Sequence, residues 1–342
     1  MNILMVGPDS NEKGGIATVI SNFKNYFNEP DIRLFFLSSW TKRKKWRTEW
    51  LAYIQIRKLI HEKQIDLVHF HVAQKGSFFR KAFLARLVPK YCRVIFHMHA
   101  SKFDIFYKES SSIIKWWIRH TFDQLDGVVA LSENWAAFYG NLTQTPISVI
   151  QNAVKVPEKS LFNPEASNII TLGRVGKRKG SFDLLEIAKE IHPFFPEIQF
   201  ILYGDGATEK LAKEIQEKNI KNVSLGGWIT LEEQSSVLEN AILHFLPSYF
   251  EGLPMSILET MGAGIPNLTT KVGGIPEAIQ SGKNGLLVAP GDLNGMFEKL
   301  LFFLSIPTFQ KNLSQEARNT IQKDFSIKTY HEKWRLLYKN LK

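Results

Sequence analysis

The sequence contains a single cysteine, Cys92, among 342 residues. One thiol excludes an intramolecular disulfide and any zinc or iron–sulfur site built from several cysteines. No window approaches 18 uninterrupted apolar residues, so no segment is predicted to span a bilayer. The opening residues, MNILMVGPDS, lack a basic stretch and predict a strand rather than a signal peptide. We therefore expect a cytoplasmic protein, at most peripheral on the inner face of the cell membrane.

The composition is that of a globular protein, with 44% hydrophobic and 22% charged residues. A chain of this length exceeds what one hydrophobic core holds, which predicts two domains. The net charge of +10 is uneven, because residues 1–155 hold 22 Lys+Arg against 12 Asp+Glu, whereas residues 156–342 hold 21 of each. Six of the eight tryptophans also lie in the first part. The two halves are therefore expected to have different partners.

Short apolar runs alternate along the chain with longer segments of helical period. The strands expected in the first half are 3–6, 33–37, 66–71, 93–97, 128–131 and 148–150. Those expected in the second half are 169–172, 200–203, 223–225, 242–246, 267–269 and 285–288. This order predicts an α/β protein with two doubly wound, Rossmann-like domains at 1–155 and 156–325. Ligands of such sheets bind beyond the carboxyl ends of the strands, so we expect the domains to face each other across a ligand-binding cleft.

Glycines and cations follow the first strand of each half. Gly14 and Gly15 open a helix, but their spacing matches neither the dinucleotide fingerprint nor the Walker P-loop. In the second half, GRVGKRKG stands between a strand and a helix. Cations beside a helix N-terminus suit a diphosphate that gains charge as it leaves. We favour Arg174 and Lys179 for this role over Lys177 and Arg178, although a solvated basic loop is the alternative.

The segment FEGLPMSILETMGAGIP, residues 250–266, carries two acids eight residues apart. Pro254 suits the first turn of a helix, so the preceding Glu251 would lie at the helix N-terminus and Glu259 inside the helix. The first carboxylate could accept hydrogen bonds from sugar hydroxyls, and the second could hold ribose hydroxyls. A surface acid and a helix-cap acid are the alternative.

These motifs, with GGIPEAI and GKNGLLVAPGD after them, resemble the retaining nucleotide-sugar glycosyltransferases of glycosyltransferase family 4, which have the two-domain GT-B fold. The resemblance covers essentially the whole chain and is most specific in the second half. In the first half, GGIATVI, DLVHFH, HMHAS and VIQNAV match more loosely, in the manner of transferases of bacterial capsule or exopolysaccharide assembly. One departure is Lys155, where the family commonly has Asp in the linker.

The resemblance implies a role for each matching residue. The catalytic set would be His99 near the donor sugar, Glu251 on its hydroxyls, and Arg174 and Lys179 on the diphosphate. The donor-binding set would be Gly14, Gly15, Gly173, Gly252, Leu253, Pro254, Met255 and Glu259. The final helix, 326–342, would pack back on the first domain.

The expected activity is metal-independent transfer of a hexose or N-acetylhexosamine, with retention, to a saccharide that is lipid-linked. The donor would be a UDP-sugar in preference to a GDP-sugar, and no cofactor is expected. Two alternatives are open. One is a nucleotide-sugar epimerase or hydrolase of the same architecture, and the other is a non-catalytic subunit that binds a sugar nucleotide.

Two His-x-His pairs permit a different interpretation. Residues i and i+2 of a strand point to the same face, so His69, His71, His97 and His99 could converge. Four imidazoles would suit zinc and a metal hydrolase. We favour His99 at the active site, with the other three supporting it or packed in the core, and expect no metal.

Cations and tryptophans alternate in the first half, over residues 39–50 and again around 102–120. This chemistry suits an anionic membrane surface, and no motif of a nucleic-acid-binding fold accompanies it, so we expect no nucleic-acid partner. A solvated loop with buried aromatics is the alternative. The candidate membrane contacts are Trp40, Lys42, Arg43, Lys44, Lys45, Trp46, Trp116 and Trp117.

Overall fold

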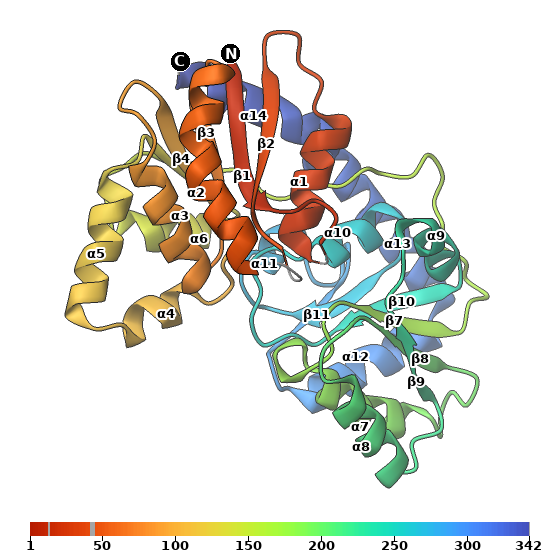
Figure 1. Cartoon of the computed structure of the whole chain (residues 1–342). Coiled ribbons are helices and arrows are strands. Elements are labelled where there is room, and N and C mark those ends of the chain that lie inside the picture. The colour runs from red at the N-terminus through yellow and green to blue at the C-terminus, as the bar shows by residue number, and fades with distance from the viewer. Residues whose placement is uncertain (13, 42–44, 342) are drawn as a thin grey trace. The chain divides into compact units, whose positions relative to one another are not determined.

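The computed structural model describes residues 1–12, 14–41 and 45–341. The chain forms two compact units, one of residues 1–152 with 327–342 and the other of residues 153–326. Each unit is a parallel sheet with packed helices, as the alternation of the sequence predicted (Figure 1). No helix in the described part of the chain has both the length and the apolar character needed to cross a bilayer.

The first unit contains a six-stranded parallel sheet in the order β2-β1-β3-β4-β5-β6. Its strands are β1 (Asn2–Pro8), β2 (Arg33–Trp40), β3 (Leu67–Val72), β4 (Arg93–Met98), β5 (Gly127–Ala130) and β6 (Ile147–Val149). All six predicted strands are confirmed. Strands β3 and β5 are buried along their whole length, because helices cover the sheet and leave few strand positions in contact with water.

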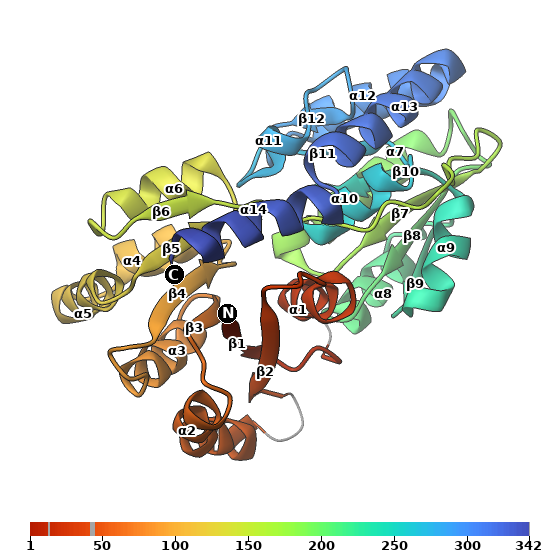
Figure 2. The same ribbon diagram turned by 90° about the horizontal axis from the view of Figure 1, so that it is seen from above.

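Helices cover both faces of this first sheet. They are α1 (Gly15–Tyr26), α2 (Lys45–Glu62), α3 (Gly76–Arg86), α4 (Phe103–Glu109), α5 (Ser112–Asp123), α6 (Glu133–Gly140) and α14 (Ile327–Asn340). The core of one face joins Val68 and Phe70 of β3 to side chains of α2 and α3. Helix α14 lies on the other face (Figure 2), where the rings of Trp334 and Phe23 are 5.5 Å apart. The end of the chain is thus part of the first unit's packing.

The second unit contains another six-stranded parallel sheet, in the order β12-β11-β10-β7-β8-β9. Its strands are β7 (Asn168–Leu172), β8 (Gln199–Tyr203), β9 (Val223–Gly227), β10 (Ala241–Leu246), β11 (Asn267–Thr270) and β12 (Leu286–Val288). These six also confirm the predicted strands. The order in which the chain adds strands reverses between β7 and β10, and ligands of doubly wound sheets bind at such a switch point.

The helical elements of the second unit form a core on each face of its sheet. They are η1 (Lys177–Lys179), α7 (Ser181–Ile191), α8 (Thr208–Glu217), α9 (Leu231–Glu239), α10 (Met255–Gly262), α11 (Ile275–Ala278), α12 (Leu293–Ser305) and α13 (Pro307–Asp324). Helix α9 begins with a capping box, in which Thr230 and Glu233 bond each other's backbone amides. The short turn η1 follows β7 and helix α10 follows β10, so both elements lie where the order of the strands reverses.

Candidate functional site

A cluster of charged side chains lies at the carboxyl ends of β7 and β10 in the second unit. The Nζ of Lys179 is 2.6 Å from Oε1 of Glu251, and Nη1 of Arg178 is 3.4 Å from Oε2. The Ser248 hydroxyl donates to Oε1 over 2.8 Å. The side chains of Lys179 and Glu251 are only 10% and 7% exposed, so this pair is held in a low-dielectric environment where its charges interact strongly. Two of the predicted catalytic residues are therefore in direct contact.

Backbone contacts fix η1 beside the loop that carries Glu251. Gly180 has φ of 68° and ends η1, and a Cβ on it would lie 2.0 Å from the carbonyl oxygen of Pro247. Only glycine fits such an approach and such a backbone angle. The amide of Tyr249 donates to the carbonyl of Arg178 over 2.8 Å, and Nη1 of Arg178 donates to the carbonyl of Phe250. These contacts bring Lys179 to the acid from a distant part of the sequence.

The glycine-rich turn before α11 supports the other side of the acid. Gly273 has φ of 57°, and a Cβ there would lie 2.1 Å from the carbonyl oxygen of Glu251. The amide of Gly274 donates to the carbonyl of Gly252 over 2.6 Å. The KVGGIP and FEGLP segments therefore pack backbone against backbone, which explains why glycines occur at these positions.

The predicted diphosphate residues Arg174 and Gly173 follow β7. Gly173 has φ of 142°, and a Cβ there would lie 3.5 Å from Nζ of Lys179, so the lysine extends over this glycine. Arg174 is exposed, unlike Lys179. The structure thus brings Gly173 and Lys179 together and leaves Arg174 at the solvent-facing edge of the loop.

Residues 252–255 are buried and lead into α10, which begins at Met255. Leu253 and Met255 are 3% and 8% exposed. Pro254 was predicted in the first helical turn, and this was wrong by one position, because the helix begins at Met255 and Pro254 is its N-cap. The N-cap has an extended backbone (ψ 130°), which precedes the helical geometry, and proline offers no side-chain cap to the first-turn amides.

Glu259 lies inside α10, as predicted. Its Oε2 accepts a hydrogen bond from Nε2 of Gln234 over 3.1 Å. Burial raises the pKa of the Glu259 carboxyl above its usual value, whereas the bond from Gln234 lowers it. The carboxyl can accept hydrogen bonds from a diol, and its amide partner on α9 orients it.

The predicted residues of the first unit lie in two places. Gly14 is the N-cap of α1, with φ of 132°, and Gly15 is the first helical residue. Both are exposed, and among the described residues a Cβ on Gly14 would meet no atom within 4 Å. His99 follows β4 and is partly exposed. The amide of His99 donates to the carbonyl of Val72 over 2.7 Å, which ties it to the end of β3.

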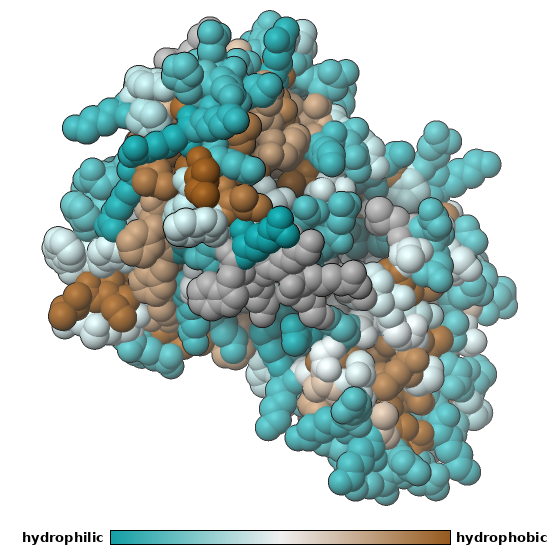
Figure 3. All heavy atoms as spheres, viewed as in Figure 1, coloured by the Kyte–Doolittle hydropathy of each residue, from teal (hydrophilic) through white to brown (hydrophobic). Residues whose placement is uncertain are grey.

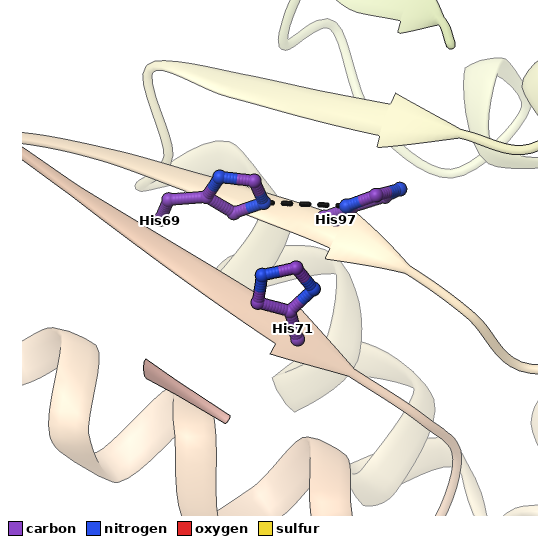
Figure 4. Close-up of side chains that lie close together, drawn as sticks. All are labelled: His69, His71 and His97. Carbon is purple, nitrogen blue, oxygen red and sulfur yellow. Dashed lines mark hydrogen bonds between the residues drawn. The ribbon is translucent and has the colours of Figure 1, made fainter. Parts of the chain in front are cut away.

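Four histidines do converge on one face of this sheet. His69, His71 and His97 are fully buried, and one ring nitrogen of each lies within 4.8 Å of the others, so these three could hold a transition-metal ion (Figure 4). Nε2 of His69 lies 3.2 Å from Nδ1 of His97. Burial lowers the pKa of all three imidazoles well below the usual value, so they are neutral at neutral pH.

The predicted membrane residues differ in exposure. Lys42, Arg43 and Lys44 lie outside the described residues, while Lys45 and Trp46 open α2. Trp40 is partly buried at the end of β2. Trp116 on α5 is 63% exposed, and hydrophobic side chains gather at this edge of the first unit (Figure 3). Trp117 is instead partly buried and packs on the core, with its ring centroid 5.0 Å from that of Phe79.

Sequence analysis missed two residues of the second unit's site, Ser248 and His244, and ranked a third, Arg178, too low. Ser248 carries no motif of its own, and its role depends on the turn after β10. Arg178 was ranked below Arg174, because a run of cations does not show which side chain turns inward. His244, inside the apolar run of β10, bonds Asn267 over 2.6 Å and accepts from the amide of Leu172. Burial lowers the pKa of His244 to about 4. The sequence could have pointed to this residue, because a histidine inside a predicted buried strand is unusual.

Comparison with known proteins places each unit in a glycosyltransferase family. Residues 14–156 match the family model described as "Glycosyltransferase Family 4", and residues 154–320 match "Glycosyl transferases group 1". Together the two models account for most of the chain.

Several curated proteins are similar in sequence. The chain is 29% identical over 159 residues to "2-deoxystreptamine N-acetyl-D-glucosaminyltransferase" of Niallia circulans, a match that covers 46% of this chain and 41% of the relative's length. It is 26% identical to "Uncharacterized 41.2 kDa protein in cps region" of Klebsiella pneumoniae, over 87% of this chain and 88% of the relative. It is 24% identical to "UDP-Gal:alpha-D-GlcNAc-diphosphoundecaprenol alpha-1,3-galactosyltransferase" of Escherichia coli, over 91% and 84%.

A solved structure shares the fold. Anabaena Alr3699/HepE, solved in complex with UDP-glucose, is 16% identical in sequence to this chain. The structural match covers 99% of this chain and 100% of HepE, with a TM-score of 0.77. The two parallel six-stranded sheets are those of the GT-B fold. The chain therefore belongs to the GT-B glycosyltransferases, with a first unit of the family 4 type and a second unit of the group 1 type.

Proposed function

We propose that this chain is a retaining glycosyltransferase that moves a hexose or N-acetylhexosamine from a UDP-sugar to a saccharide acceptor, most simply a lipid-linked one, in surface polysaccharide assembly. The buried contact between Lys179 and Glu251 carries the proposal. A related galactosyltransferase is named for a UDP-sugar donor and a diphosphoundecaprenol acceptor, and HepE was solved with UDP-glucose.

The charges of the cluster suit a leaving diphosphate. Glu251 faces both Lys179 and Arg178, so the cluster holds one more positive than negative charge. In the reaction, the bond from the anomeric carbon to the diphosphate breaks, and the acceptor hydroxyl forms the new bond on the same face. The acceptor proton leaves with the diphosphate, whose growing charge is stabilised by Lys179, because preorganised cations act most strongly on charge that develops in the transition state.

Glu251 binds a different part of the donor from the cations, namely the transferred sugar. When Lys179 turns to the diphosphate, the carboxylate is released to accept hydrogen bonds from hydroxyls of the transferred sugar. Ser248 stays bonded to Oε1 and keeps the carboxylate oriented. Glu259 holds the ribose through its second acceptor position.

A nucleotide screen followed by product analysis tests this function. Thermal shift with UDP, GDP and their sugars should select a UDP-sugar, since a ligand that binds only the folded state raises the melting temperature. The best donor is then incubated with a membrane lipid extract, and the product's anomeric configuration is read by NMR, with the donor's configuration expected. Donor loss without transfer would instead indicate an epimerase or hydrolase, and a chelator should leave the rate unchanged.

The acceptor side of the proposal places the first unit on an anionic membrane from the cytoplasmic side, through α5. Ile113 and Trp116 of α5 are 79% and 63% exposed. Lys115 and Arg119 of the same helix line a hollow of about 560 Å³ with Tyr107, whose hydroxyl accepts a 2.7 Å bond from Nε of Arg119. Exposed apolar side chains beside cationic ones suit the boundary between the acyl chains and the anionic headgroups of a membrane.

Flotation with vesicles tests the membrane contact. The double variant I113S/W116S should lose binding to vesicles containing phosphatidylglycerol, whereas F194S, a change of an exposed aromatic residue in the second unit, should bind normally. Equal flotation of both variants would remove α5 from the proposal and leave the sugar transfer unaffected.

A further inference from the structure

A buried chain of hydrogen bonds joins four elements of the second unit, β7, β10, β11 and α10 (Figure 1). Its side chains are His244 of β10, Asn267 of β11 and Thr260 of α10, and each of them is 0% exposed. Nδ1 of His244 lies 2.6 Å from Oδ1 of Asn267, and Nδ2 of Asn267 donates to the Thr260 hydroxyl over 3.0 Å. On the other side of the imidazole, the amide of Leu172 in β7 donates to Nε2 of His244 over 3.3 Å.

Each polar atom of this chain has a defined role. The amide of Leu172 can only donate, so Nε2 of His244 is an acceptor, and the single proton of the neutral imidazole is on Nδ1. Nδ1–H therefore donates to Asn267, which in turn donates to Thr260. The Thr260 hydroxyl donates to the carbonyl of Ser256 over 2.8 Å. The bonds thus run in one direction from β7 to α10.

The β7 end of the chain lies beside the diphosphate side of the proposed donor site. Leu172 is the last residue of β7, and the next residue is Gly173, over which Lys179 extends. Burial lowers the pKa of His244 to about 4, so the imidazole is neutral and adds no charge to the cluster. The charges of Lys179 and Glu251 act on the same pKa in opposite directions, which places the imidazole within electrostatic reach of that ion pair.

The other end of the chain lies in α10. Thr260 follows Glu259, the residue proposed to hold the ribose, in a helix that spans only Met255–Gly262. Because a helix this short moves as one piece, the bond between Asn267 and Thr260 also fixes Glu259. The chain of bonds therefore sets the spacing between the groups that are proposed for the ribose and for the diphosphate.

Stability alone does not account for these polar side chains. Replacing two bonded polar groups in a core by apolar groups of the same shape is nearly neutral or stabilising. A fully bonded polar network instead specifies one arrangement, because a shifted element would leave buried polar atoms unpaired. The carboxyl end of β10 is held in the same way, since the hydroxyls of Thr171 and Thr269 donate to the carbonyls of Phe245 and Leu246, each over 2.7 Å.

We propose that His244 is a positioning residue for sugar transfer, which acts through Asn267 and Thr260 to hold α10 and its Glu259 at a fixed distance from the loop after β7. The inference rests on the proposed function, because that function places the ribose and the diphosphate of a sugar nucleotide on these two elements. Binding groups must be held within about 0.5 Å of their productive positions, so a small shift of α10 weakens donor binding and slows transfer.

Hydrogen exchange measured by mass spectrometry tests the link without a ligand. T260V removes the hydroxyl and keeps the shape of the side chain, whereas T260S keeps the hydroxyl and is the matched control. We expect T260V to speed amide exchange about fivefold in residues 172–180, the effect of one lost hydrogen bond, although these residues belong to other elements. T260S should exchange there as the unaltered protein does. Faster exchange confined to α10 would overturn the inference.

Calorimetry with UDP and steady-state kinetics test the effect on the site. H244L removes both bonds of the imidazole, whereas H244Q keeps one acceptor and one donor. We expect H244L and T260V to bind UDP about fivefold more weakly and to lose about tenfold in kcat/KM, while H244Q and T260S stay within about twofold of the unaltered protein. L300A, which opens a cavity in the core under α12, should unfold more easily and bind UDP normally.

The outcomes separate the inference from the proposed function. If the protein transfers sugar but H244L and T260V equal their controls in kcat/KM, the network is only structural, the inference is wrong and the function stands. If L300A binds UDP as weakly as T260V does, lost stability explains the effect, and the inference is again wrong. If residues 172–180 exchange faster in T260V while the unaltered chain neither binds nor transfers any sugar nucleotide, the function fails, and the role given to His244 fails with it.

Discussion

Replacing Lys179 by methionine tests the buried ion pair most fully. Methionine keeps the length of the side chain and removes the ammonium that lies 2.6 Å from Oε1 of Glu251. Breaking a buried pair costs about 3–5 kcal/mol, because the remaining charge is left without compensation. Ser248 and Arg178 still contact the carboxylate, so we expect the lower end of that range, about 3 kcal/mol in the free energy of unfolding.

The same element supplies a matched control. Lys177 lies in η1 with Lys179 but is exposed, so K177M should change the unfolding free energy by less than about 0.5 kcal/mol. Unfolding in urea measures the stability, and calorimetry measures the affinity for UDP. K179M should bind UDP at least about tenfold more weakly, which is the loss of one charge-assisted bond to the diphosphate. The double variant K179M/E251Q should recover part of the stability, because it removes both charges.

Two results would refute this reasoning. If K179M and K177M were equally stable, the contact between Lys179 and Glu251 would not hold the loop. If K179M lost stability but bound UDP as tightly as the unaltered protein, the lysine would be structural, and the diphosphate would have to be bound by other cations.

Three further predictions concern the framework of the two units. G180A should lose more stability than G282A by urea unfolding, because both have positive φ but only at Gly180 would a Cβ strike a backbone oxygen; equal losses would contradict the close approach. Y338F should cost about 1–3 kcal/mol, since Nδ1 of His69 loses its buried partner, and an unchanged unfolding free energy would show that the bond contributes nothing. Stability should fall as pH drops below about 6.5, by about 1.4 kcal/mol per pH unit for each histidine that titrates only when unfolded, because the pKa values of His99 and His244 in the folded state are about 3 and about 4. H244Q should reduce that slope by one histidine's share between pH 6 and 5, and an unreduced slope would mean that His244 is protonated in the folded protein.

The sheets could be predicted because their strands are buried on both faces. Strand β10 reads AILHFL and is buried at every position, so its apolar run stands out from the flanking helices. The exact start of α10 could not be predicted, because Pro254 is compatible with either the N-cap or the first turn. Only the observed ψ of 130° places it before the helix.

The residues of the site that belong to local motifs could be predicted from the sequence. The contacts between loops that are distant in the sequence could not. Glu251 and Lys179 were found from their motifs, but the contact between them requires the close approach of Gly180 to Pro247, which no spacing reveals. The tryptophans of α5 illustrate the same limit. Trp116 and Trp117 are adjacent, yet only the arrangement of α5 on the core decides that the first is exposed and the second packed.

For the histidines, the sequence pattern predicted that the side chains share one face of the sheet, but it did not predict which groups they contact. Alternation along a strand places His69 and His71 together. The pairing of His71 with His97 depends on the register between β3 and β4, which the sequence does not encode locally. The contribution of Tyr338 requires α14 to return to the first unit over more than 260 residues of chain.

The central claim is that the Lys179 and Glu251 cluster activates a nucleotide sugar for transfer with retention. The most direct measurement incubates the purified chain with a UDP-sugar and a lipid-linked saccharide, and determines the mass and anomeric configuration of the product. The account predicts an acceptor extended by one sugar with the donor's configuration, and a K179M protein that folds but does not transfer. An inverted product, or K179M turnover equal to that of the unaltered chain, would contradict it.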